Sequence, residues 1–344
     1  MKSSLHTWTW VVWLGSALMA ISITRNFFYL LLILLCLLVV HYVIAGAAPG
    51  NAYPFSLLRF GFLIGGFSTL FNLLVSHVGE TVLFSLPKSW PLVGGNYTLE
   101  AATYGLLNGL ILFNILVAFA VFSQALPVRA LIRLIPRAFF PVAVVASIAI
   151  TFIPTTIRQF QQVKEAQLIR GQRMKSIGDW LPLGMALLVG GLERALQLSE
   201  AMTARGFASV EAGQSRHFSR LGMVGGLILA TLGWILYSRP GWENWGLGII
   251  LLGALWLFGA LRRAGRQIRS TTYWREKWRF GDALVLLGMG IFGLVLFFPF
   301  AAVARNTLNY SVYPLFQWPY FDPWIGAACL ALSLPAYVIG LRKE

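Results

Sequence analysis

Long apolar runs constrain the fold of this 344-residue chain more than any other feature. Residues 27–40 and residues 284–300 contain no charged side chain at all. A transmembrane helix needs about 20 predominantly apolar residues, and these runs approach that length. The whole chain is 58% hydrophobic and 11% charged, whereas soluble domains contain about 25% charged residues. The composition therefore predicts a protein that crosses a membrane several times.

The apolar runs predict an all-α integral membrane protein with about eight transmembrane helices. A four-span N-terminal bundle is expected over residues 1–126, a cytoplasmic or interfacial module over 127–220, and a C-terminal membrane region of about four spans over 221–344. In the third span, Gly61 and Gly65 form a GxxxG pattern, which is a weak indication of close helix packing. The expected spans lie near residues 8–23, 27–48, 57–78, 104–126, 221–238, 245–261, 281–303 and 324–341.

The basic residues predict the orientation of these spans. Residues 127–137 contain three arginines and no acid, and residues 262–279 contain seven basic residues and one acid. The loops expected on the other side, at 79–103, 238–245 and 304–323, contain one basic residue each. Cytoplasmic loops collect Lys and Arg, so the chain is expected to have both termini in the cytoplasm. The same rule explains the net charge of +15 without a nucleic-acid partner.

Residues 138–153 are apolar enough to resemble a further span. A crossing there would place the basic stretches on its two sides on opposite faces of the membrane and would invert every later loop. We therefore expect a helix in the cytoplasmic interface, interrupted near its ends by Pro141 and Pro154.

A seven-residue pattern, E-A-x-x-x-R-G, occurs twice in the expected module, at 165–171 and at 200–206. Arginine in the last helical turn complements the negative end of the helix dipole, and glycine just beyond it ends the helix easily. Capping explains either copy alone, whereas two copies indicate two equivalent docking elements. Guanidinium suits docking, because it stays charged when partly desolvated and binds carboxylates through two hydrogen bonds. The candidate docking residues are Arg170, Gly171, Arg205 and Gly206, supported by Glu165, Ala166, Ile169, Glu200, Ala201 and Ala204.

The stretches "IRQFQQVKEAQLIRG" at 157–171 and "LERALQLSEAMTARGF" at 192–207 resemble the coupling module of the transmembrane T component of energy-coupling factor (ECF) transporters, the EcfT/CbiQ family. The likeness extends over about 127–210, and Pro154 resembles the proline that breaks the helix at the face toward the S component. Ile169 stands where the family usually has alanine. The four spans expected after the module exceed the one or two expected of the family.

The resemblance implies that Arg170 and Arg205 dock into two ABC-type ATPase subunits, which form a homo- or heterodimer. It also implies that the module cradles a membrane-embedded S component in a prokaryotic cell membrane, for uptake of a vitamin or a transition metal. The chain itself would be no enzyme and would hold no cofactor or metal.

Two other readings stay open. An integral-membrane acyl- or glycosyltransferase would show clustered His, Asp and Glu at a membrane face, whereas the module's five acids are scattered and its one histidine is His217. Another ABC permease subunit would carry shorter coupling helices without this duplication. The chain contains no G-x-x-x-x-G-K-[ST] phosphate-binding loop, so ATP hydrolysis is expected in partner subunits.

Overall fold

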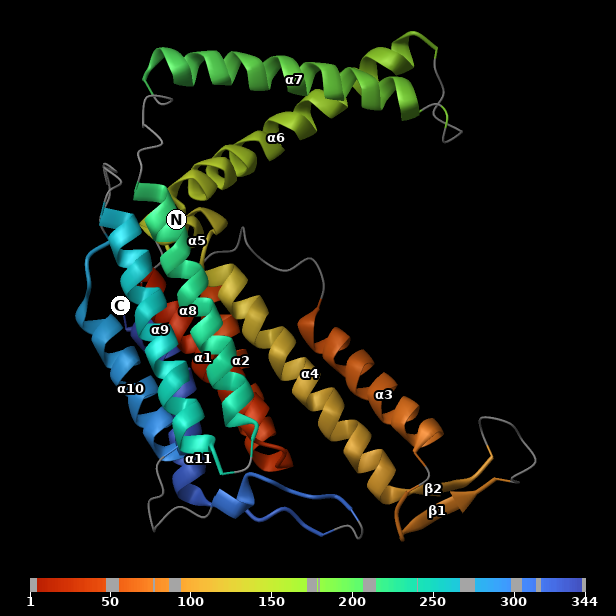
Figure 1. Ribbon diagram of the computed structural model, residues 1–344. Helices are drawn as coiled ribbons and strands as arrows, with labels where there is room; N and C mark the ends of the chain where they lie inside the picture. Colours follow the sequence, from red (N-terminus) through yellow and green to blue (C-terminus); the bar gives the residue numbers. More distant parts are fainter. Residues whose placement is uncertain are drawn as a thin grey trace. The chain divides into compact units, whose positions relative to one another are not determined.

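The computed structural model describes residues 5–47, 56–76, 78–86, 94–171, 178, 180–206, 215–239, 241–266, 276–297, 305–313 and 317–341. These residues are mainly helical (Figure 1). The chain forms two compact units, one of Met1–Ala130 with Trp274–Glu344 and one of Leu131–Tyr273. The third region expected from the sequence, 221–344, is therefore divided between the units. The all-α membrane class is confirmed.

The first unit is built from the two ends of the chain. Its helices are α1 (Thr7–Ile23), α2 (Phe27–Ala47), α3 (Leu57–Val75), α4 (Leu99–Ala125), α10 (Phe280–Phe297), α11 (Pro323–Leu330) and α12 (Leu334–Gly340), with a 3-10 turn, Ala331–Ser333, between the last two. Helix α4 packs on α1, α2 and α3, α10 packs on α1, and α11 and α12 pack on α2. Trp13, Leu37 and Val117 are fully buried at these contacts.

Helices α3 and α4 approach closely at glycines. A Cβ placed on Gly109 would lie 2.8 Å from the Cα of Gly65, and one on Gly105 would lie 2.8 Å from the carbonyl oxygen of Ser68. Gly61 lies against the ring of Phe113. Close backbone approach at small residues is typical of helix pairs in membranes. The GxxxG pattern of the sequence thus lies at a helix contact.

Two acids, one in the first turn of α10 and one just before that helix, bind the start of α1. Asp282, which is fully buried, accepts hydrogen bonds from the backbone N–H of His6 at 2.6 Å, the hydroxyl of Thr9 at 3.1 Å and the N–H of Arg279 at 2.9 Å. Glu276 accepts from the N–H and the hydroxyl of Thr7 at 3.1 and 2.8 Å. Carboxylates are favoured at helix N-termini, where backbone N–H groups have no partner within the helix. The last part of the chain is thereby attached to its first helix.

The second unit contains α6 (Phe140–Ile169), α7 (Trp180–Ala204), α8 (Ser215–Tyr237) and α9 (Glu243–Arg266), preceded by a 3-10 turn at Arg137–Phe139. The short helix α5 (Val128–Ile132) crosses the boundary between the units. Helices α8 and α9 form a hairpin in which glycines contact the opposite backbone. A Cβ on Gly253 would lie 2.8 Å from the backbone nitrogen of Ala230, and one on Gly233 would lie 2.7 Å from that of Ile250.

Each of the eight expected spans is helical over most of its described residues. Among the described residues, seven helices are long and apolar enough to cross a membrane: α2, α3, α4, α6, α7, α9 and the α11–α12 segment. Helices α1, α8 and α10 are also apolar, but their apolar stretches (Thr7–Ile23, Gly222–Tyr237 and Phe280–Leu296) are only 10–17 residues long. Helices α6 and α7 belong to the module that the sequence predicted at the membrane interface. Their length and apolar composition would also allow them to cross a membrane.

Two local features differ from expectation. Pro154 lies inside α6, which continues to Ile169, so the helix break expected there is wrong. Hydroxyls around the proline bond back to the helix, from Thr151 to the Ser147 carbonyl and from Thr155 to the Phe152 carbonyl. In the expected loop 79–103, β1 (Val82–Ser85) pairs antiparallel with β2 (Asn96–Thr98). Pro141 lies at the start of α6, where proline is tolerated.

We predict that Asp282→Ala lowers the free energy of unfolding by about 1–3 kcal/mol, because three donors lose a buried acceptor. The measurement is the thermal unfolding midpoint of the detergent-solubilised chain. Glu80→Ala, which removes an exposed acid, is the control and should leave the midpoint unchanged. Equal midpoints for the two variants would show that the attachment of α10 contributes nothing.

A second prediction concerns the α8–α9 hairpin. Gly253→Ala should lower the unfolding midpoint, because the new methyl group meets the backbone of Ala230, which cannot move aside locally. Gly248→Ala, in the same helix, meets nothing within 4 Å. It should be neutral or stabilising by up to about 1 kcal/mol through helix propensity. Matching gains in both variants would contradict close packing at Gly253.

Candidate functional site

The first E-A-x-x-x-R-G element ends α6. The N–H of Arg170 donates to the Ala166 carbonyl at 3.2 Å, and the N–H of Gly171 donates to the Leu168 carbonyl at 3.0 Å. Gly171 has a φ of 80°, in the left-handed region that glycine adopts without a Cβ penalty. The helix therefore stops at the Arg-Gly pair.

The second element ends α7 with the same hydrogen-bond pattern. The N–H of Arg205 donates to the Ala201 carbonyl at 3.3 Å, and that of Gly206 donates to the Thr203 carbonyl at 2.9 Å. The φ of Gly206 is 74°. Two separate helices thus end in one geometry, with a left-handed glycine immediately after the arginine.

Both arginine side chains are exposed, as are Glu165, Glu200 and the alanines of the two elements. Ile169 is 87% exposed beside Arg170, which is unusual for so apolar a side chain. Among the residues that the structure describes, neither Arg170 nor Arg205 makes an ion pair or a side-chain hydrogen bond. The elements lie at the ends of two different helices, and their guanidinium groups are exposed to solvent without a partner in the described part of the chain.

Helices α6 and α7 contact each other around Pro154. Arg194 donates from Nη1 to the hydroxyl of Thr155 at 3.2 Å, and its guanidinium lies 5.9 Å from the ring centroid of Phe152. The side chain of Gln159 lies against Gly190, where a Cβ would collide with it. Phe160 stacks on Trp180 with centroids 6.3 Å apart.

The sequence reasoning missed the residues of this crossing. Arg194 lies inside the stretch that carries the family resemblance, but it stands among other polar residues such as Glu193 and Gln197, so no sequence signal set it apart. The contacts join the two arginine-ended helices into one structural element.

An apolar stripe runs along α7. Its residues recur every three or four positions, so they share one face of the helix. Each is at least 55% exposed, and on α6 Ile153 and Ile157 are exposed as well. Within the described ranges nothing covers this surface, which we call the α7 stripe. It consists of Leu181, Met185, Leu188, Leu192 and Leu196.

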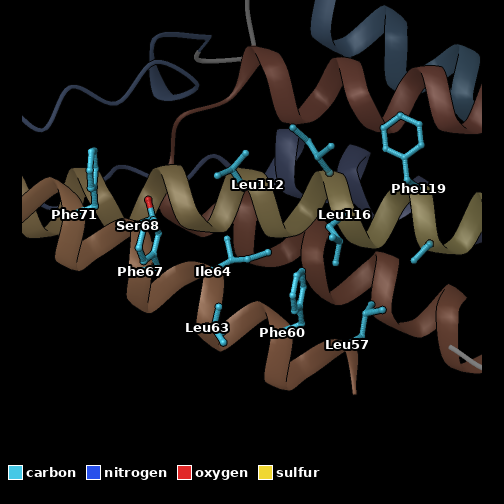
Figure 2. A pocket seen from close by; sticks show the side chains of 12 residues that line it. Leu57, Phe60, Leu63, Ile64, Phe67, Ser68, Phe71, Leu112, Leu116 and Phe119 are labelled. Atoms are coloured by element: carbon cyan, nitrogen blue, oxygen red, sulfur yellow. The ribbon is translucent and has the colours of Figure 1, made fainter. Parts of the chain in front are cut away.

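Two apolar grooves of the first unit lie beside α3. One, of about 870 Å³, lies between α3 and α4, and Figure 2 shows Phe60, Ile64 and Phe67 of α3 facing Leu112 and Leu116 of α4. The other, of about 960 Å³, lies between α2, α3 and α4. The lining residues of both grooves are almost all apolar; the exceptions are Ser68 in the first and Thr69 and Tyr97 in the second. No group of three His, Cys, Asp or Glu side chains able to hold a metal ion occurs in the described part of the chain.

Comparison with known proteins identifies the family. Residues 1–215 match the model of the CbiQ family, described as cobalt transport protein. Over 202 residues the chain is 27% identical to the energy-coupling factor transporter transmembrane protein EcfT 1 of Listeria monocytogenes serotype 1/2a (strain 08-5578), which covers 50% of this chain and 74% of that protein. Over 173 residues it is 28% identical to the EcfT protein of Listeria innocua serovar 6a (strain ATCC BAA-680 / CLIP 11262), covering 44% of this chain and 64% of that protein. The matched region contains α1 to α7 and both arginine-glycine helix ends, and the chain belongs to the EcfT/CbiQ family of transmembrane transporter components.

Proposed function

We propose that this chain is the T component of an ECF-type ABC importer, transmitting the ATP-driven motion of two ATPase subunits to a membrane-embedded S component. The transported substrate would be a vitamin or a transition-metal ion. The observation that carries the proposal is the pair of equivalent helix ends, each with an exposed and unpaired arginine before a left-handed glycine.

Each arginine would dock into one ATPase subunit. The glycine turns the backbone away at the helix end, so the guanidinium and the last carbonyls of the helix lie at the tip. Arginine binds a carboxylate through two parallel hydrogen bonds, and this fixes orientation as well as affinity. Two tips of one kind suit a homodimer, or a heterodimer whose subunits share a docking groove.

The α6–α7 crossing would carry the motion. Arg194 and Gln159 hold the two helices together, so movement at one tip displaces the other helix. A rigid helix pair passes a displacement on, whereas a flexible loop absorbs it. In this mechanism Pro154 lies at the crossing of the two helices and does not interrupt α6.

The α7 stripe would be the contact surface for the S component. A row of exposed leucines and methionine is larger than the scattered apolar residues of an ordinary surface, and such patches mark interaction sites or membrane contacts. The same reading places the chain in a prokaryotic cell membrane with both termini and the basic loops in the cytoplasm. Catalysis of ATP hydrolysis is assigned to the partner subunits.

The arginines provide the decisive experiment. We predict that Arg170→Ala or Arg205→Ala weakens co-purification of the ATPase subunits, and that the double variant abolishes it or uncouples ATP hydrolysis from uptake. Losing one partner of a buried charge pair costs about 2–5 kcal/mol. The two sites share no partner, so their costs should nearly add. Arg→Lys should restore function only in part, because an ammonium group cannot reproduce the two-pronged contact.

Capping alone makes a different prediction. If the arginines only complement the helix dipoles, each substitution costs about 0.3–1 kcal/mol of helix stability and the ATPases stay bound. Arg158→Ala, which removes an exposed arginine from the middle of α6, is the matched control. A double arginine variant that holds its ATPases and transports at the wild-type rate would refute the docking proposal.

A separate prediction tests the α7 stripe. Leu192→Glu should release the S component while the ATPases remain bound, because burying an unpaired carboxylate in an apolar interface is costly. Gln197→Glu adds the same charge on another face of α7 and should keep both partners. The measurement is the subunit composition of the purified complex. Wild-type amounts of S component with the Leu192 variant would exclude the stripe as its contact.

A further inference from the structure

The first unit contains a polar cavity near the end of α1 and the start of α4. None of its lining residues belongs to the two E-A-x-x-x-R-G elements. It has a volume of about 470 Å³ and lies between the end of α1, the first turns of α4 and the segment 309–313. This cavity contrasts with the apolar grooves beside α3, because polar side chains from three parts of the chain line it. They are Ser22, Arg25, Tyr104, Asn108, Asn309, Tyr310, Ser311 and Tyr313.

Hydrogen bonds hold the walls of this cavity in place. The side-chain amide of Asn26 donates to the carbonyl oxygens of Thr307 and Tyr320 at 2.9 and 2.8 Å. The backbone N–H of Arg25 donates to the Leu308 carbonyl at 2.9 Å, and the backbone N–H of Asp322 donates to the hydroxyl of Tyr29 at 2.7 Å. The segment that closes the cavity is therefore fixed to the start of α2.

The hydroxyls of two wall tyrosines, Tyr310 and Tyr313, already have partners. Tyr310 donates its hydroxyl to the Gln317 carbonyl at 2.5 Å, and burial raises the pKa of this phenol, which keeps it neutral. The hydroxyl of Tyr313 lies 3.3 Å from that of Ser76, and its ring lies beside that of Tyr104 with centroids 5.8 Å apart.

Other donors of the cavity have no partner. The guanidinium of Arg25, the amides of Asn108 and Asn309 and the hydroxyl of Tyr104 make no hydrogen bond or ion pair with any residue that the structure describes. Arg25 and Asn309 are exposed to solvent, and Asn108 and Tyr104 are half-buried. No acid lines the cavity. It therefore combines one permanent positive charge with several unpaired donors, and such a set is satisfied by an anion that has several oxygen atoms.

The surroundings indicate the level of the membrane surface. Tyr320, whose carbonyl accepts from Asn26 next to Arg25, is 76% exposed, and Trp318 and Trp324, close to it in the sequence, are 81% and 67% exposed. Exposed Trp and Tyr collect at the lipid headgroup level of membrane proteins, where one side of the ring is apolar and the other is hydrated. Lipid phosphate groups lie at the same level.

We propose that this cavity binds a phosphate group, with Arg25 as its principal ligand and Asn108, Asn309 and Tyr104 as further donors. Guanidinium binds two phosphate oxygens at once, and the amides and hydroxyl satisfy the remaining oxygens. The phosphate comes from a phospholipid headgroup or from the free anion, and both present the same oxygens to these donors.

The test uses the full-length chain, delipidated in detergent, with dioctanoyl phosphatidylglycerol and inorganic phosphate as separate probes. Binding is measured by native mass spectrometry and titration calorimetry. Arg25→Gln should weaken binding of the lipid by about tenfold or more, and Arg25→Lys by less. Asn309→Ala, at an exposed position, should weaken it by about two- to tenfold through one lost hydrogen bond. Arg239→Gln, which removes an exposed arginine outside the cavity, is the matched control and should bind as the wild type does.

The arms of the experiment separate the sources. If inorganic phosphate binds with the same dependence on Arg25 and displaces the lipid, the free anion is the ligand. If only the lipid binds in this way, the headgroup is the ligand. Dioctanoylglycerol has the same tails without phosphate and should not compete. Wild-type lipid affinity in a folded Arg25→Gln protein, or displacement by dioctanoylglycerol, would overturn the phosphate site.

Discussion

The attachment of α10 to the start of α1 determines how the rest of this chain is arranged. Asp282 and Glu276 satisfy N–H groups at the first turn of α1, groups that no residue of α1 itself can reach. In a membrane protein these unpaired donors are costly wherever water is scarce. Because residues near 280 complete a helix that begins near residue 7, the chain must return to its beginning. Everything between residues 131 and 273 is thereby an insertion into one unit.

This arrangement explains what the sequence could and could not predict. Apolar runs report the length of a helix and its preference for lipid, so the positions of the spans followed directly from composition. Division into units depends on which helices touch, and a polar pair such as Asp282 and His6 carries no signal of its partner 276 residues away. For the same reason, the division of residues 221–344 between two units was not foreseen. The family match ends at residue 215, yet α10 to α12 complete the unit that contains α1 to α4.

In the candidate site, too, local geometry could be predicted from the sequence, whereas contacts between distant residues could not. Arginine before glycine is a local pattern, and the local geometry follows from it, including the positive φ of both glycines. Proline removes one helix hydrogen bond and crowds the preceding turn, which is why a break was expected at Pro154, but α6 continues through it to Ile169. The contact of Arg194 with Thr155 joins residues 39 positions apart, so only the structure reveals it. Local chemistry was therefore predictable, and the pairing of α6 with α7 was not.

The two units also bear on the proposed mechanism, because the chain passes between them twice. One passage, at Ala130 and Leu131, lies within the short helix α5, and the other lies between Tyr273 and Trp274. A displacement of the second unit can therefore pass to the first along the chain on either side of residues 131–273. The second connection leads within a few residues to Glu276 and Asp282, the acids that hold the start of α1. In the proposed importer, a displacement of the arginine-ended helices would therefore act on the membrane bundle at α5 and at this acidic attachment. The extra C-terminal helices would then serve to fix the bundle against which the coupling helices move.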